Sequence, residues 1–103
     1  MSETAIPSHS SDAARSRSPL AGLKVLELGQ LIAGPFAGKT LGDFGAEVIK
    51  VEPPGGDKTR NLPGLGMGFF RSFNRNKKSV VLDITTEAGR QTAAELIGTC
   101  DVV

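Results

Sequence analysis

The segment that most constrains the fold of this chain is residues 26–52, LELGQLIAGPFAGKTLGDFGAEVIKVE. Short apolar runs lie at residues 23–28 and 48–51, and the second run consists mainly of β-branched residues, which favour buried strands. Gly45 precedes the second run and suits the left-handed residue that follows a helix. The segment therefore predicts a strand, a short helix and a parallel second strand, joined as a right-handed βαβ unit.

The predicted helix of this unit runs from about Pro35 to Phe44. Gly34 before Pro35 is typical of an N-cap and a first helical position, where the missing N–H of proline costs nothing. Apolar residues at helical spacing predict the face that covers the sheet: Phe36, Ala37, Leu41 and Phe44. Ligands of parallel sheets bind beyond the carboxyl ends of the strands, so residues 29–34 and the chain from Pro53 onward should be neighbours at a ligand site.

Further strands and a second helix are expected downstream. Residues 79–84 predict a third strand, and residues 101–103 the start of a fourth. Thr85 or Thr86 can cap a helix that begins at Glu87 and ends near Gly98. One face of this helix should contact the core through Ala93, Leu96, Ile97 and Cys100.

These elements predict an α/β fold with a parallel sheet. Such a sheet needs both faces covered, and two helices cannot cover them, so we expect residues 19–103 to be the first part of a longer domain. Residues 1–18 are rich in Ser, Ala and Arg without apolar periodicity, which predicts a disordered tail.

The glycine-rich stretch from Lys58 to Gly68 predicts a long loop whose far end is held to apolar surface by Phe69, Phe70 and Phe73. Between Lys58 and Lys78 there are six basic side chains and no acidic one. This segment suits either a solvated loop or contact with an anion such as phosphate.

Composition excludes several classes of protein. The formal net charge of +1 argues against a nucleic-acid partner. No apolar run approaches the roughly 18 residues of a transmembrane helix, and no signal peptide is recognisable, so we expect a cytoplasmic protein without membrane association, with a mitochondrial location as the alternative. A single His9 and a single Cys100 offer no metal-ligand cluster, and Cys100 is better explained as a small core residue than as a nucleophile.

Two motif-like strings have simpler explanations. Ala33, four further residues and Gly38-Lys39-Thr40 satisfy the loosest phosphate-loop pattern, but the lysine would then lie in the middle of a short helix rather than at its start. A nucleotide hydrolase is therefore kept only as an alternative. Alternating glycines at residues 64–68 follow no strand and precede no expected helix, so they indicate a loop rather than a dinucleotide fingerprint.

Five segments together resemble the amino-terminal part of the class III coenzyme A transferases. They are, in order, residues 19–28 (PLAGLKVLEL), 33–36 (AGPF), 41–52 (LGDFGAEVIKVE), 56–60 (GDKTR) and 74–83 (NRNKKSVVLD). The family includes formyl-CoA, carnitine and bile-acid CoA-transferases and the α-methylacyl-CoA racemases. The resemblance implies a doubly wound, Rossmann-like large domain in an interlocked homodimer, and CoA as a substrate rather than a permanently bound cofactor.

The resemblance also implies where CoA binds. The adenine end of CoA is expected against the strand end formed by Leu82, Asp83, Ile84 and Thr85. The side chains available for its phosphates are Arg60, Arg75, Lys77 and Lys78.

The family's transferases use an aspartate that forms an enzyme thioester, and the matching position lies beyond Val103, so no catalytic residue is assigned in this segment. We therefore expect a CoA-transferase acting on an acyl-CoA and a carboxylic acid, and we expect this segment alone to be inactive. An acyl-CoA racemase of the same superfamily and an inactive fragment stay as alternatives. Ile32 and Pro53 replace the glutamine and arginine of oxalate-type members, which disfavours oxalate as a substrate.

Overall fold

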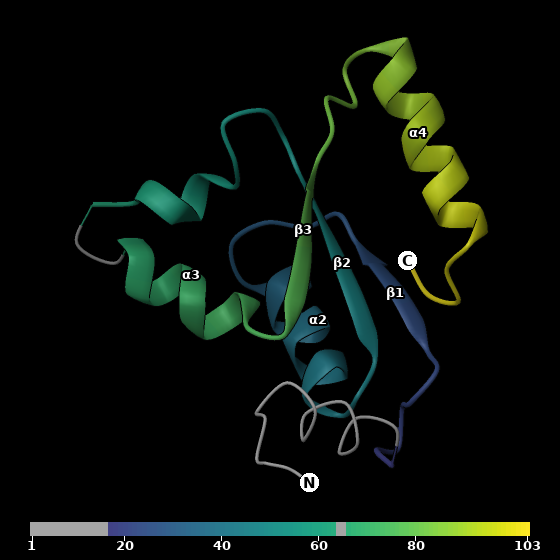
Figure 1. The fold of residues 1–103 in the computed structure, drawn as a ribbon. Helices are drawn as coiled ribbons and strands as arrows, with labels where there is room; N and C mark the ends of the chain where they lie inside the picture. The colour runs from purple at the N-terminus through teal and green to yellow at the C-terminus, as the bar shows by residue number, and fades with distance from the viewer. Residues whose placement is uncertain (1–16, 64–65) are drawn as a thin grey trace, which may run out of the picture.

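The computed structural model describes residues 17–63 and 66–103, so most of the tail predicted at residues 1–18 lies outside the described residues. The described residues form three strands, three α-helices and a 3-10 helix (Figure 1). In order these are β1 (Lys24–Glu27), α2 (Ala33–Asp43), β2 (Glu47–Glu52), η1 (Lys58–Asn61), α3 (Gly66–Asn74), β3 (Lys77–Val81) and α4 (Glu87–Gly98).

The strands form a parallel sheet in the order β1-β2-β3. On the other side of β1, Val102 forms a parallel bridge with Val25, and the N–H of Leu26 donates to the carbonyl oxygen of Val102 at 2.9 Å. The chain thus adds strands outward from β1 to β3 and then returns to the opposite edge of β1. This reversal is the start of a doubly wound sheet and confirms the predicted α/β class.

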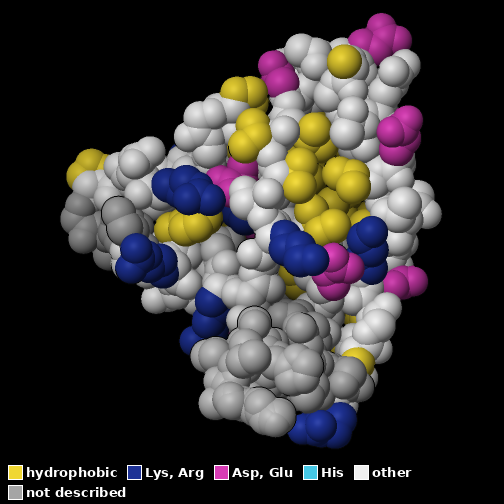
Figure 2. All heavy atoms as spheres, in the orientation of Figure 1, with side chains coloured by type: hydrophobic (Ala, Val, Ile, Leu, Met, Phe, Trp, Pro, Cys, Tyr) yellow, Lys and Arg dark blue, Asp and Glu magenta, His cyan; other side chains and the backbone are white. Residues whose placement is uncertain are grey.

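Alternation along the strands produces two apolar clusters, one on each face of the sheet. Val25, Ala46 and Val48 are buried on the face that carries α2. Leu26, Ile49 and Val51 are buried on the opposite face, where α4 packs through Leu96 and Cys100. Figure 1 shows α2 behind the sheet and α4 beside β1, and Figure 2 shows apolar side chains between α4 and the strands on the near face.

The packing face of α2 differs from the prediction. Phe36 and Phe44 are 50% and 52% exposed, whereas the buried positions of the helix are Pro35, Gly38 and Gly42. A Cβ at Gly38 would lie 2.1 Å from Oε1 of Glu27, so the helix approaches the sheet more closely than a large side chain allows. Of the predicted face, Leu41 does pack against the core cluster. The closest approach to the sheet is made by glycine and proline, and the aromatic rings are half exposed.

The ends of α2 also differ in part. The helix begins at Ala33, with Ile32 as N-cap and without a side-chain capping bond, so Pro35 occupies the third helical position rather than the first. Leu31 just before it has a φ of 69°, a left-handed conformation. Gly45 has a φ of 106°, which confirms the predicted left-handed residue after the helix.

The predicted loop from Lys58 to Gly68 is wrong where the structure describes it. It contains η1, which Asp57 caps by accepting the N–H of Thr59 at 2.8 Å, and the first residues of α3. Glycine disfavours helix, but tertiary contact outweighs propensity here because α3 packs its Phe73 ring against that of Phe36, with centroids 6.2 Å apart.

The remaining elements follow the prediction closely. The strand β3 begins two residues earlier than predicted and ends before Leu82. The bounds of α4 agree with the prediction, and Thr86 caps it by accepting the N–H of Gly89 at 3.0 Å. On α4, Ala93 is buried whereas Ile97 is 41% exposed, so the face of the helix that contacts the core is narrower than predicted. None of the helices in the described part of the chain has the length and apolar character needed to cross a membrane.

Candidate functional site

A small crevice opens where the carboxyl ends of the three strands meet. It has a volume of about 70 Å³ and is lined by Leu28, Gln30, Val51, Pro53, Leu82 and Ile84. The segments after β1 and β2 therefore adjoin one another, as the sequence predicted. Leu82 and Ile84 were predicted as site residues, and Gln30 and Pro53 lie in the segments predicted to adjoin a ligand site. Leu28 and Val51 were not predicted. The rule that ligands bind at strand ends was the only signal for them.

Two backbone hydrogen-bonding groups lie open at this crevice, and a proline explains one of them. The N–H of Leu82 donates to the carbonyl of Glu52 at 2.9 Å and extends the parallel ladder past β3. The next donor in this ladder would be residue 54, which is proline and has no N–H. In the described part of the chain, the carbonyl of Leu82 and the N–H of Ile84 form no hydrogen bond with another backbone group. An acceptor and a donor are thus available beside apolar side chains.

The other two predicted residues of this strand end form a tight turn. The Asp83 carboxylate accepts the N–H of Thr85 at 3.0 Å and its hydroxyl, and these bonds hold the pKa of Asp83 below its usual value. Arg90 of α4 donates to the carbonyl of Thr85 at 3.2 Å. Asp83 and Thr85 therefore shape the turn that presents Ile84, rather than offering free side chains.

Lys77, the first residue of β3, is enclosed by protein groups. Its Nζ forms an ion pair with Glu27 and donates to the carbonyls of Pro35 and Phe73, at 2.9 and 3.0 Å, and to Oδ1 of Asn74 at 2.7 Å. Burial lowers the pKa of Lys77, against the opposing effect of Glu27. A phosphate could reach this ammonium only by displacing several of these partners.

Arg75 and Lys78 also pair with carboxylates, but at the surface. Arg75 donates to Asp43 at the end of α2, at 2.9 Å, and this bond lowers the pKa of Asp43. Lys78 pairs with Glu47 at 2.9 Å, and its side chain is 72% exposed. Both basic residues lie at the amino end of β3, whereas Leu82 lies at its carboxyl end, about 13 Å from Lys78 for four extended residues.

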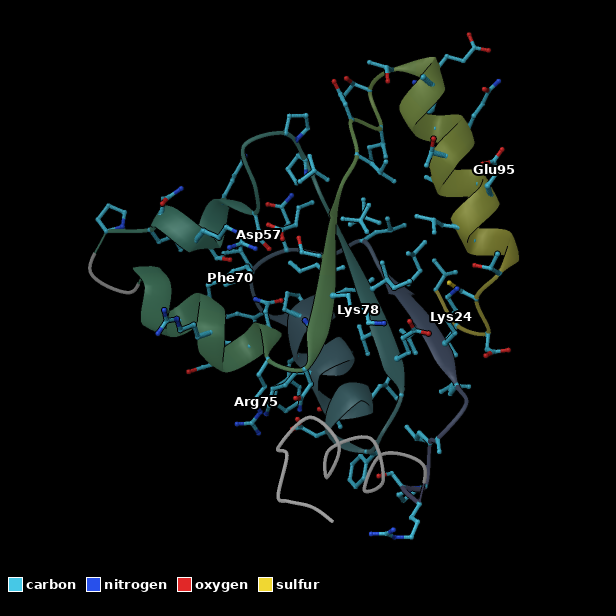
Figure 3. The ribbon with its side chains drawn as sticks, in the orientation of Figure 1. Lys24, Asp57, Phe70, Arg75, Lys78 and Glu95 are labelled. Carbon is cyan, nitrogen blue, oxygen red and sulfur yellow. The ribbon has the colours of Figure 1, made fainter. Side chains whose placement is uncertain are left out.

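The basic residues of β3 differ in the face of the sheet on which their side chains lie. Alternation places Lys78 on the same face of β3 as Val80 and Leu82, and Figure 3 shows Lys78 on the near face of the sheet. Lys77 and Ser79 lie on the opposite face, toward α2. Of the basic residues on β3, Lys78 therefore shares a face with the apolar lining of the crevice.

Beneath α2 and η1 the sheet buries an ionic cluster that was not predicted from the sequence. Lys50 contacts Glu27 and Asp57 at 2.9 Å each, and all three side chains are almost fully buried. Burial alone would raise the pKa of Asp57, but hydrogen bonds from Lys50 and Thr59 outweigh it and lower the pKa. The cluster ties the segment after β2 to the interior of the sheet. The strand β2, EVIKVE, contained a signal for this cluster. Side chains alternate between the two faces of a strand, so Lys50 lies on the same face as the buried Val48 and Glu52.

Arg60 belongs to the same side of the sheet. Its Nε and Nη2 donate to the two carboxylate oxygens of Glu52 at 2.7 and 2.8 Å, and the guanidinium lies 4.1 Å from the centre of the Phe70 ring. Glu52 also accepts the hydroxyl of Ser79 and the N–H of Asp57. The bond from Arg60 is the main cause that lowers the pKa of Glu52 to about 2.

The phosphate-loop-like string has structural roles in the described residues. Gly38 leaves space for Glu27, and Thr40 donates its hydroxyl to the carbonyl of Phe36 at 2.9 Å. Lys39 lies within α2 rather than at its start, with Nζ 4.9 Å from the centre of the Phe36 ring. No group of three or more potential metal ligands occurs among residues 17–63 and 66–103.

Comparisons with known proteins place this architecture in a family. Residues 20–103 match the profile described as CoA-transferase family III. The chain is 48% identical over 89 residues to human succinyl-CoA:glutarate CoA-transferase, an alignment that covers 82% of this chain and 20% of the human protein. It is 47% identical over 91 residues to the probable fatty acyl-CoA transferase Rv3272 of Mycobacterium tuberculosis, covering 82% of this chain and 23% of that protein.

Solved structures agree with the sequence matches. A crystal structure of Rv3272 superposes with a TM-score of 0.77 at 48% identity, over 82% of this chain and 24% of that chain. A CAIB/BAIF family protein from Brucella suis gives a TM-score of 0.75 at 44% identity, over 82% and 25%. The chain thus spans about a quarter or less of the length of these relatives. It belongs to CoA-transferase family III.

Proposed function

We propose that this chain is the amino-terminal part of an enzyme that transfers CoA from an acyl-CoA to a carboxylic acid, and that the crevice at the strand ends contacts the adenine end of CoA. The observation that carries this proposal is the pairing of open backbone groups with an apolar surface. Leu82 and Ile84 supply a carbonyl and an N–H, and Leu28 and Pro53 supply apolar contact. An adenine edge presents the complementary donor and acceptor, and its rings favour apolar contact.

Lys78 is the basic residue that we assign to a CoA phosphate. It lies on the same face as Leu82, and its ion pair with Glu47 is exposed and therefore easily exchanged for a stronger, doubly charged partner. Arg75 and Lys77 would first have to leave Asp43 and Glu27. Arg60 is held by Glu52 on the other side of the sheet.

The chemistry of transfer needs a nucleophile that we place beyond residue 103. In this proposal an aspartate carboxylate attacks the thioester carbonyl of the acyl-CoA, and the CoA thiolate leaves as a mixed anhydride forms. The thiolate then attacks the aspartyl carbonyl, which gives an enzyme thioester and releases the acyl group as a carboxylate. Repetition of these steps in reverse with a second acid completes the exchange. We further propose that the full-length protein is a homodimer.

Calorimetric titration of the full-length protein with CoA tests the placement of the ligand. Lys78→Gln should weaken CoA binding about tenfold, the equivalent of one charge-assisted hydrogen bond. Arg75→Gln is the matched control, because it also removes one exposed, paired charge near the start of β3, and it should change the affinity less than threefold. Equal losses in the two variants would show that only overall charge matters and would overturn the assignment of Lys78.

An activity assay tests the reaction itself. The full-length protein should move CoA from succinyl-CoA to an added carboxylic acid, with formation of the new thioester. Exchange of the α-proton of a 2-methylacyl-CoA with solvent, without any CoA transfer, would instead identify a racemase. A nucleotide hydrolase would release phosphate from ATP and would not respond to acyl-CoA.

A further inference from the structure

A second pocket lies between η1 and α3, to the side of the sheet (Figure 1). It has a volume of about 310 Å³ and is lined by Arg60, Asn61, Phe70 and Arg71. Figure 3 shows Phe70 on the side of α3 that faces η1, and Figure 2 shows basic side chains around an apolar group in this part of the molecule. No carboxylate is among the lining residues that the structure describes.

One wall of this pocket is fixed from beneath. Glu52 is 1% exposed and holds Nε and Nη2 of Arg60 with both of its carboxylate oxygens. The guanidinium then lies over the Phe70 ring, which leaves Nη1 outside the ion pair. The arginine is therefore already oriented before any ligand arrives, and a ligand loses little affinity to ordering it.

The other wall supplies the net charge of the pocket. The Arg60–Glu52 ion pair has no net charge, so Arg60 offers an oriented hydrogen-bond donor to the pocket but adds no net positive charge. Arg71 follows Phe70 on α3, is exposed, and forms no hydrogen bond or ion pair with the residues that the structure describes. Arg75, Lys77 and Lys78 each pair with a carboxylate of another element. Within the described part of the chain, Arg71 therefore has no counter-ion, and the neighbouring Arg60 has Nη1 free to donate a hydrogen bond.

We propose that this pocket binds a phosphate monoester through Arg71, Arg60 and Asn61, with the organic part of the ester against Phe70. Donors approach from three residues, and a phosphate offers three terminal oxygens in a tetrahedral arrangement to meet them. A carboxylate offers two oxygens in one plane, which a single guanidinium fork already saturates. The apolar ring favours an ester over free phosphate.

Phenyl phosphate is a suitable probe, because it combines the phosphate group with a ring for Phe70. Calorimetric titration of the full-length protein should show tighter binding of phenyl phosphate than of inorganic phosphate or benzoate. Arg71→Gln should weaken phenyl phosphate about tenfold, the loss expected for a charge-assisted hydrogen bond. Because Arg71 forms no hydrogen bond or ion pair with the residues that the structure describes, the melting temperature of this variant should stay unchanged.

Lys58→Gln is the matched control. Lys58 is also exposed, also lies beside the pocket on η1 and also lacks a described ion pair, but it does not line the pocket. Its replacement should weaken phenyl phosphate less than threefold. Equal losses in both variants, or benzoate binding as tight as phenyl phosphate, would overturn the proposal by showing general attraction between charges.

The natural source of the phosphate follows from two further titrations. If Arg71→Gln weakens CoA but leaves 3′-dephospho-CoA unchanged, the site receives the 3′-phosphate of CoA. If it weakens neither while phenyl phosphate binding is lost, the site receives a different phosphorylated compound. Both results support the site, and neither depends on CoA transfer, since the probe is bound in the absence of acyl-CoA.

Discussion

Lys50 and Glu27 form an ion pair of 2.9 Å between neighbouring strands, and both side chains are almost completely buried. Lys50 also contacts Asp57 at 2.9 Å and donates to the carbonyl of Gly29 at 3.1 Å. The ammonium thus joins the ends of β1 and β2 to the segment that leads into η1. Loss of Lys50 would leave Asp57 buried without its cation and would leave Glu27 with Lys77 alone.

The first prediction concerns this ammonium. Lys50→Met should lower the free energy of unfolding by about 3 to 5 kcal/mol, because Glu27 and Asp57 stay buried while their shared cation is lost. Urea denaturation of the full-length protein measures the change. Lys78→Met is the control, since it breaks the exposed pair with Glu47 and should cost about 0 to 1 kcal/mol. Similar losses in the two variants would contradict a buried role for Lys50.

The second prediction concerns the glycines of the helices. Gly38→Ala should destabilise the protein, because the new Cβ would lie 2.1 Å from Oε1 of Glu27. Gly68→Ala in α3 meets no heavy atom within 4 Å and should stabilise the protein by about 0.5 to 1 kcal/mol through helix propensity. Thermal denaturation of both variants gives the two signs. A Gly38→Ala variant as stable as the parent would show that α2 lies further from β1 than described.

The third prediction concerns pH. The pKa of Glu52 falls from 4.5 to about 2 on folding, mainly because Arg60 donates to its carboxylate. The folded protein therefore binds fewer protons than the unfolded chain between these values. The stabilisation from this group is complete above about pH 4.5 and is lost as the pH falls toward 2.

Glu52→Gln tests this dependence. The variant should be less stable at neutral pH, and its free energy of unfolding should change less than that of the parent between pH 4.5 and pH 2. Chemical denaturation at a series of pH values measures both slopes. Identical slopes would mean that other carboxylates cause the acid sensitivity.

The fourth prediction concerns Lys39, the lysine of the phosphate-loop-like string. Its Nζ lies beside the Phe36 ring within α2, and it contacts neither the crevice nor the buried cluster. Lys39→Ala should therefore leave acyl-CoA turnover within a few fold. A loss of about a thousandfold in a variant that still folds, about 4 kcal/mol of transition-state stabilisation, would restore the interpretation as a nucleotide-binding loop.

The sequence by itself determined the elements whose causes are local. Short apolar runs specified β1 and β2, Thr86 and Glu87 specified the start of α4, and Gly45 specified the end of α2. The family could also be recognised, because its residues recur at fixed spacing along the chain. The strand end that carries Leu82 and Ile84 could be located for the same reason.

Only the tertiary structure decided which groups meet. No acidic residue lies between Lys58 and Lys78 in the sequence. In the structure, however, Arg60, Lys77 and Lys78 pair with Glu52, Glu27 and Glu47 of the strands. The packing face of α2 was mispredicted because helical periodicity ranks side chains by hydrophobicity, whereas close approach over Glu27 selects glycine. Likewise α3 forms despite its glycines, because Phe73 packs against Phe36 of α2, a partner that no local pattern reveals. Contacts between residues distant in sequence depend on how the sheet and helices are assembled, and that assembly exists only in the folded chain.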